Sequence, residues 1–133
     1  MATSSRSADG SAWTPVFVAV AVASLGLFVH NAVEFPHMPL SRPEYSAPTA
    51  LWLVLTVIWW GLRRHEWPAK VLFAWGAISL AGAITTVLPL PFLPFRPEQS
   101  LRHYGVHLIY ALTQLPILWI LWPRRQSRAA EDY

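Results

Sequence analysis

The stretch GSAWTPVFVAVAVASLGLFVHNAV, residues 10–33, contains no Asp, Glu, Lys or Arg, and stretches of this kind decide the fold. Three further stretches lack the same four residue types, namely residues 45–62, 71–95 and 103–123. Each is close to or above the length of about 20 residues that a helix needs to cross the hydrocarbon core of a bilayer. The sequence therefore predicts a membrane protein.

We predict an all-α membrane protein, an antiparallel bundle of four transmembrane helices that forms a single domain. The domain covers 1–133, with approximate spans at 13–35, 46–63, 69–91 and 103–123 and polar tails at 1–12 and 124–133. The composition agrees, because 54% of the residues are hydrophobic and 13% are charged. The alternative for the first span is a signal peptide cleaved after Ala23, but the apolar residues continue beyond that position.

The distribution of the cationic residues predicts the orientation. Seven lie on the side of both termini and the second-to-third connection, and three lie on the other side. The seven are Arg6, Arg63, Arg64, Lys70, Arg124, Arg125 and Arg128, and the three are Arg42, Arg96 and Arg102. By the positive-inside rule both termini are cytoplasmic. We expect a multi-pass protein of the cell membrane, in a bacterial plasma membrane.

Several classes of function are excluded or disfavoured by the composition. The chain has no cysteine, which excludes thiolate catalysis and Cys-ligated metal sites. The pI of about 9.8 is compatible with nucleic-acid binding. However, the basic residues lie at the ends of apolar stretches and form no patch, so we expect no nucleic-acid partner. The expected partners are the lipid bilayer and other membrane subunits or further copies of the chain.

Small and polar residues at helical spacing mark the faces by which membrane helices pack. In the first span these are Ala19, Ala23, Gly26, His30 and Glu34. In the fourth span they are His103, His107, Tyr110 and Gln114. We expect these two faces to meet. The third span carries a groove of small residues, Gly76, Ser79, Ala83 and Thr86. The second span has no such stripe, so we expect most of its surface to face lipid.

Four of the five histidines map to the predicted outer ends of the first and fourth spans. They are His30, His37, His103 and His107. Ionisable residues inside a membrane segment are candidates for a functional site, because their burial is expensive. Two proline-rich connections, residues 34–44 and 88–98, are expected to lie over this end of the bundle.

The sequence leaves four hypotheses open for this cluster. In the first, its side chains hydrogen-bond across the helix interface and fix the packing of the bundle. In the second, His30, Glu34, His103 and His107 bind a divalent metal. In the third, His30 and His107 are axial ligands of a b-type haem, for which Gly26 and Gly105 leave room. In the fourth, His30, His107, Tyr110 and Gln114 bind a quinone or relay protons.

The motifs contain no catalytic signature, and we name no catalytic residue. The sequence favours a non-enzymatic integral membrane protein, such as an accessory subunit of a larger complex. The alternative is a membrane redox or metal-binding protein that uses His30 and His107. The cofactor, if there is one, stays undetermined between haem, quinone and a divalent metal.

Overall fold

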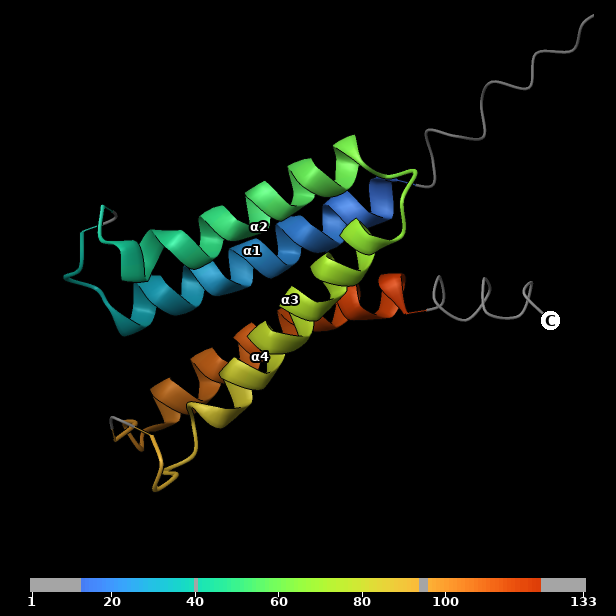
Figure 1. The fold of residues 1–133 in the computed structure, drawn as a ribbon. Coiled ribbons are helices and arrows are strands. Elements are labelled where there is room, and N and C mark those ends of the chain that lie inside the picture. The colour runs from blue at the N-terminus through green and yellow to red at the C-terminus, as the bar shows by residue number, and fades with distance from the viewer. Residues whose placement is uncertain (1–12, 40, 94–95, 123–133) are drawn as a thin grey trace, which may run out of the picture.

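The computed structural model describes residues 13–39, 41–93 and 96–122. Within these residues all regular structure is helical, in four helices (Figure 1). They are α1 (Thr14–Glu34), α2 (Pro43–Gly61), α3 (Trp67–Thr85) and α4 (Leu101–Leu121). The prediction of an all-α chain with four helices is confirmed.

The first residues of each helix explain where it begins. Pro15, Pro43 and Pro68 lie in the first turns of α1, α2 and α3. Proline is well tolerated there, because a backbone N–H in the first turn has no partner within the helix and the ring already holds a helical φ. The fourth helix uses a side-chain cap instead, in which the Ser100 hydroxyl accepts a hydrogen bond from the His103 backbone N–H at 3.2 Å.

The third helix is shorter than the predicted span of 69–91, because it ends at Thr85. The residues that follow form turns, in which the Leu88 N–H donates to Thr85 O and the Leu90 N–H to Leu88 O. Pro89 and Pro91 have no N–H to donate and disfavour a helical conformation of the residue before them. The predicted span follows the apolar composition past these prolines, whereas the helix ends before them. Every other helix end lies within three residues of its predicted position.

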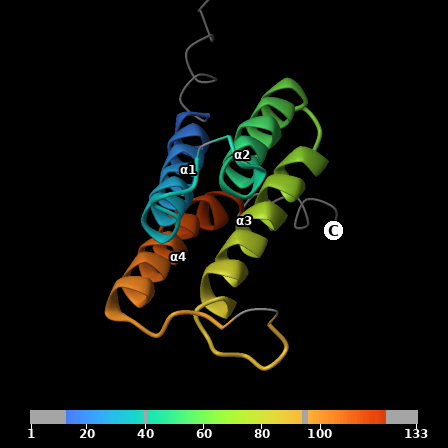
Figure 2. The same cartoon turned by 90° about the vertical axis from the view of Figure 1, so that its left-hand side faces the viewer.

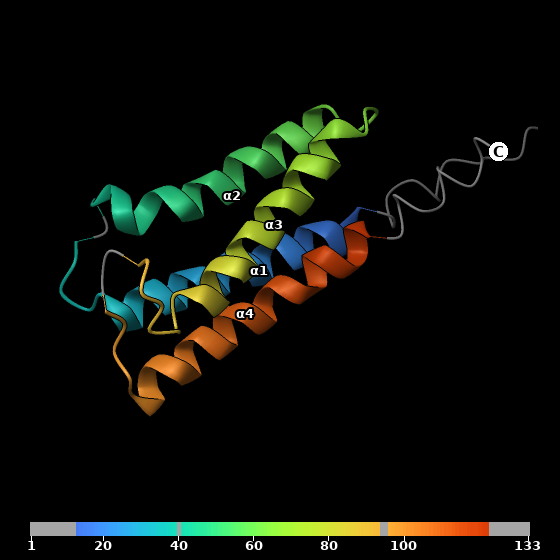
Figure 3. The same cartoon turned by 60° about the horizontal axis from the view of Figure 1, so that its bottom comes forward.

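The helices alternate in direction along the chain (Figures 1 and 3). The α1–α2 and α3–α4 connections lie at one end of the bundle. The α2–α3 connection lies at the other end, together with the N-terminal end of α1 and the C-terminal end of α4. The most extensive packing joins α4 to α1 and to α3 (Figure 2), and α2 packs less extensively against α1 and α3.

The second helix is held by aromatic side chains. Trp52 and Trp59 are fully or almost fully buried. The Trp59 ring lies 5.6 Å from the rings of both Trp13 and Phe17, and the Trp52 ring lies 6.5 Å from that of Trp75. Much of α2 is exposed, as expected, but the expectation missed these two anchoring tryptophans.

Three of the described helices, α1, α3 and α4, are long and apolar enough to cross a membrane. The second helix falls short in apolar content, because its first turns include Pro43, Glu44, Ser46 and Pro48. Three such helices in a chain of 133 residues are typical of a membrane protein.

Candidate functional site

The candidate site is a polar cluster in the end of the bundle that contains the α1–α2 and α3–α4 connections. We define it by six side chains, His30, Asn31 and Glu34 from α1 and His103, His107 and Tyr110 from α4. Four of these are buried, and His30 and Glu34 are partly buried. Because α1 and α4 are antiparallel, the last turns of α1 lie beside the first turns of α4.

His30 and His107 face each other at the centre of the cluster. Their Nε2 atoms are 3.0 Å apart, and the two rings meet edge to face with centroids separated by 4.4 Å. This contact confirms that the polar stripes of α1 and α4 meet. The Tyr110 ring packs against His30 with a centroid separation of 5.1 Å. The two imidazoles are therefore enclosed by protein groups in the helix interface.

The second ring nitrogen of His30 connects the cluster to α2. His30 Nδ1 lies 3.0 Å from Asn31 Oδ1, and Asn31 Nδ2 donates to the backbone carbonyl of Tyr45 at 3.0 Å. Asn31 is 4% exposed, so its amide depends on these partners for its hydrogen bonds. At this point a buried side chain fixes the α1–α2 contact.

The second ring nitrogen of His107 connects the cluster to α3. His107 Nδ1 lies 3.0 Å from the backbone carbonyl of Ala83 and 3.4 Å from the Thr86 hydroxyl oxygen. The Thr86 hydroxyl itself donates to Gly82 O at 2.7 Å. Together with the contact to Tyr45, these bonds mean that the polar cluster joins all four described helices.

Glu34 and His103 form the outer part of the cluster. His103 Nδ1 donates to Glu34 Oε2 at 2.9 Å, and the two side chains are 8% and 12% exposed. The His103 ring also packs against His107, with centroids 4.3 Å apart. Glu34 Oε1 and His103 Nε2 are buried without a hydrogen-bond partner among the described residues. A buried carboxylate is costly unless positive charge or hydrogen bonds compensate it, so Glu34 depends on its histidine neighbours.

Gln114, the deepest residue of the predicted site, lies away from the histidines. Its side chain is fully buried in the α1–α4 interface, and Nε2 donates to the Ala23 and Tyr110 carbonyls at 3.3 Å. Its Oε1 has no hydrogen-bond partner in the described part of the chain. Gln114 therefore serves the contact between α1 and α4, and among the described residues its hydrogen bonds go to Ala23, Tyr110 and Thr113 and not to His30 or His107.

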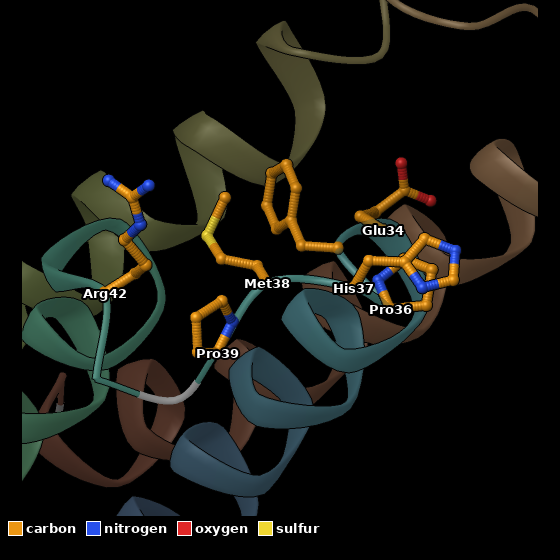
Figure 4. Close-up of a pocket in the computed structure, with 7 residues that line it drawn as sticks. Glu34, Pro36, His37, Met38, Pro39 and Arg42 are labelled. Atoms are coloured by element: carbon orange, nitrogen blue, oxygen red, sulfur yellow. The ribbon is translucent and has the colours of Figure 1, made fainter.

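An open pocket of about 570 Å³ lies beside the cluster at the α1–α2 connection (Figure 4). It is lined by Glu34, Phe35, Pro36, His37, Met38, Pro39 and Arg42. Glu34 belongs both to this pocket and to the polar cluster, whereas His37 is exposed in the connection. The pocket provides the cluster with a side that faces outward.

Outside the helices, Glu98 is exposed beside the cluster. Hydrogen bonds from Ser100 and then Arg102 lower the pKa of Glu98 below its ordinary value. Arg102 lies 3.0 Å from the Glu98 carboxylate and also donates to Val33 O at 3.1 Å. These exposed groups connect α4 to the end of α1 without entering the cluster.

The geometry bears on the metal and haem hypotheses. Among the described residues, no group of three or more His, Cys, Asp or Glu side chains is arranged to hold a metal ion. Axial ligation by two imidazoles separates their nitrogens by about 4 Å, because each metal–nitrogen bond is about 2 Å long. The observed separation of 3.0 Å is shorter, so haem between His30 and His107 requires α1 and α4 to move apart.

The two glycines that we expected to make room for haem differ in their surroundings. A Cβ at Gly26 would overlap the side chain of Thr113, so this glycine permits close helix contact and leaves no space for a macrocycle. Apart from its chain neighbours and the backbone of its own helix, no described atom lies within 4 Å of the corresponding position at Gly105.

Sequence reasoning missed the partners that the other two helices supply. Tyr45 and Ala83 contribute backbone carbonyls, which have no signature in a sequence. Thr86 and Ala83 did lie in the small-residue groove of the third span. That groove was therefore a signal for contact with the cluster, although we assigned it only to packing.

Comparison with protein-family models gives no match, and comparisons with curated proteins and with solved structures give no significant one. The four-helix layout is shared by many unrelated activities and does not define a function. Function therefore has to be argued from the polar cluster and from the surface of the bundle.

Proposed function

We propose that this chain is a four-span integral membrane protein with a structural, non-enzymatic role, such as an accessory subunit of a larger membrane complex. In this proposal both termini are cytoplasmic and the polar cluster lies near the extracytoplasmic surface of the cell membrane. The observation that carries it is the set of side-chain hydrogen bonds joining four otherwise apolar helices at one end.

The outward surface of the bundle supports a lipid environment. Large apolar side chains are exposed on every helix, among them Leu25 on α1, Val57 on α2, Ile78 on α3 and Trp119 on α4. Soluble proteins rarely expose contiguous apolar surface of this extent, whereas lipid tails solvate it well. The second helix shares this property and alternates in direction with its neighbours, which supports its assignment as the fourth span.

The polar cluster is suited to specifying how the helices pair. Interhelical hydrogen bonds in membranes contribute about 0.6 to 2 kcal/mol each. Incorrect packing would leave histidine, asparagine and glutamate groups unpaired in a medium without water, which costs more. The cluster therefore selects one arrangement of α1 and α4 even though each bond is individually weak.

Single-cysteine labelling tests the four-span topology, because the chain has no native cysteine. We choose three exposed positions in different connections and replace them as His37→Cys, His65→Cys and Phe92→Cys. An impermeant maleimide added to intact cells should label positions 37 and 92, and position 65 only after lysis. The unsubstituted chain is the control. Labelling of 37 and 65 from the same side would show that α2 does not cross.

A second candidate function is binding of a haem, a quinone or a metal through His30 and His107, and haem would also require α1 and α4 to move apart. The orientation of three histidines, His30, His103 and His107, favours it. Each places its Nδ1 atom within hydrogen-bond distance of an oxygen atom, and its Nε2 atom has no backbone partner among the described residues. Metal-binding histidines are typically oriented in this way. A visible spectrum and the metal content of the purified protein test it. A Soret band lost in His30→Ala and His107→Ala would establish haem, and stoichiometric metal without colour would favour zinc.

A further inference from the structure

A continuous row of hydrogen-bonding groups crosses the polar cluster from α2 to α3. It runs from the Tyr45 carbonyl through the side chains of Asn31, His30 and His107 to the Ala83 carbonyl. Its four successive contacts each measure 3.0 Å between heavy atoms. At this distance each contact needs one hydrogen, because two lone pairs would otherwise face each other.

The row contains fewer hydrogens than contacts when its groups are neutral. The two terminal carbonyls accept and cannot donate. The Asn31 amide offers a hydrogen to one neighbour and an oxygen to the other, and each neutral imidazole carries one N–H. Three hydrogens are thus available for four contacts. The result does not depend on the amide orientation or on the histidine tautomers.

We infer that His30 and His107 share one additional proton and form an imidazole–imidazolium pair. Each ring then donates outward through Nδ1, His30 to Asn31 Oδ1 and His107 to Ala83 O, and the additional proton lies between the two Nε2 atoms. The 3.0 Å separation suits an N–H···N hydrogen bond. Two nitrogens on one tetrahedral zinc ion are about 3.3 Å apart, so the geometry favours a proton over a metal.

The charges around the pair balance this proton. The ionisable groups that face it are Glu34 on α1 and His103 and Tyr110 on α4. The second and third helices face it with the Tyr45 and Ala83 carbonyls and the Thr86 hydroxyl. Glu34, which reaches the pair through His103, supplies one negative charge. An ionised Glu34 and one additional proton leave the cluster without net charge, which lowers the cost of burying both.

The site also has a connection to the outside. Glu34 lines the open pocket at the α1–α2 connection and binds His103, which in turn packs against His107. The pair is therefore a proton-binding site next to an outward-facing pocket. This inference rests on the proposed structural role of the cluster. It deepens that role, because the fourth hydrogen bond of the row forms only when the proton is bound.

Nitrogen-15 NMR of the full chain with labelled histidine counts the ring hydrogens directly. The protein is held in detergent at neutral pH after dialysis against a chelator, and His30→Gln and His107→Gln assign the signals. We expect three ring hydrogens on the pair and a through-bond coupling between the Nε2 atoms. Two ring hydrogens on the pair, or no through-bond coupling between the Nε2 atoms in the chelator-treated protein, would overturn the inference.

Two variants of His30 test the number of hydrogens in the row through the pH dependence of the melting temperature. In His30→Lys, an ammonium donates to both Asn31 and His107 and replaces the additional proton permanently. In His30→Gln, the amide supplies one hydrogen, as a neutral imidazole does. We expect the wild type to melt at lower temperature at alkaline than at neutral pH, and His30→Lys to lose most of this pH difference. His30→Gln should melt below the wild type at neutral pH.

An unchanged pH difference in both variants would overturn the inference, and the NMR count remains decisive if the lysine variant fails to fold. Neither measurement depends on which way the helices cross a membrane. Failure of the proposed topology would appear in the cysteine labelling and would leave the hydrogen count unaffected.

Discussion

Gly26 of α1 lies directly against Thr113 of α4, and a Cβ at position 26 would overlap the threonine side chain. Gly26→Ala should therefore force α1 and α4 apart, with a loss of about 1–3 kcal/mol that is typical of overpacking. Gly105→Ala is the matched control, because no described atom beyond its chain neighbours and its own helix backbone lies within 4 Å of the added methyl group. Thermal unfolding in mild detergent measures both. Equal melting temperatures for the two variants would argue against this close contact.

The second helix depends on buried tryptophan. Trp52→Ala removes a ring that is 0% exposed, whereas Trp119→Ala removes one that is 78% exposed. We expect a loss on the order of 1–3 kcal/mol for Trp52→Ala, below the about 3–5 kcal/mol of soluble cores, because lipid solvates the ring once the helices separate. Trp119→Ala should change the melting temperature little. A larger loss of stability for Trp119→Ala than for Trp52→Ala would contradict the packing of α2 against the bundle through Trp52.

Asn31 provides the side-chain connection between the polar cluster and α2. Asn31→Ala removes the bond to Tyr45 O and leaves His30 Nδ1 without its acceptor. We expect a loss of about 1 kcal/mol or more in the free energy of unfolding. Thr85→Ala serves as the control, because within the described part of the chain this exposed hydroxyl donates only to Ala81 O of its own helix. Melting curves of the two variants compare the contributions.

Glu34 should set the pH range in which the bundle is most stable. If its negative charge holds the additional proton on His30 and His107, Glu34→Gln should release that proton at lower pH. At neutral pH the folded pair binds this proton, whereas the histidines of the unfolded chain, with an ordinary pKa of about 6.5, have released theirs. This stability is therefore present near neutral pH and is lost as the pH rises until the folded pair releases the proton. The pH at which the melting temperature falls should therefore move downward in Glu34→Gln.

Glu98→Gln is the control for this shift. Glu98 is exposed, and its lowered pKa keeps it ionised throughout the neutral and alkaline range. Its replacement should leave the pH profile in place. A profile that moves equally in both variants would indicate a general charge effect, and the specific link between Glu34 and the histidine pair would be disproved.

The parts of the fold that depend on exclusion of charge could be predicted from the sequence. A helix in lipid cannot carry many unpaired Arg or Glu side chains, so the uncharged stretches located the four helices, with every end except that of α3 within three residues. The α1–α4 contact was also predictable, because small and polar residues at helical spacing have few other reasons to lie in a membrane segment. His30 and His107 met for this reason.

Other features of the fold and of the polar cluster could not be predicted, because they depend on interactions that amino-acid composition does not reveal. The third helix ends at Thr85, before Pro89 and Pro91, whose restrictions on the backbone an apolar count ignores. The anchoring of α2 by Trp52 and Trp59 was missed because we searched for small residues. The carbonyls of Tyr45 and Ala83 are present in every residue, so their role depends on three-dimensional placement alone.

A double-mutant cycle on His30 and His107 tests the central contact most directly. The free energies of unfolding are measured for the wild type, His30→Ala, His107→Ala and the double variant in the same detergent. Because the Nε2 atoms are 3.0 Å apart, we expect a coupling energy of about 0.6–1.7 kcal/mol, the range of interhelical hydrogen bonds in membrane proteins. Additivity to within about 0.3 kcal/mol would contradict a hydrogen bond between the two rings.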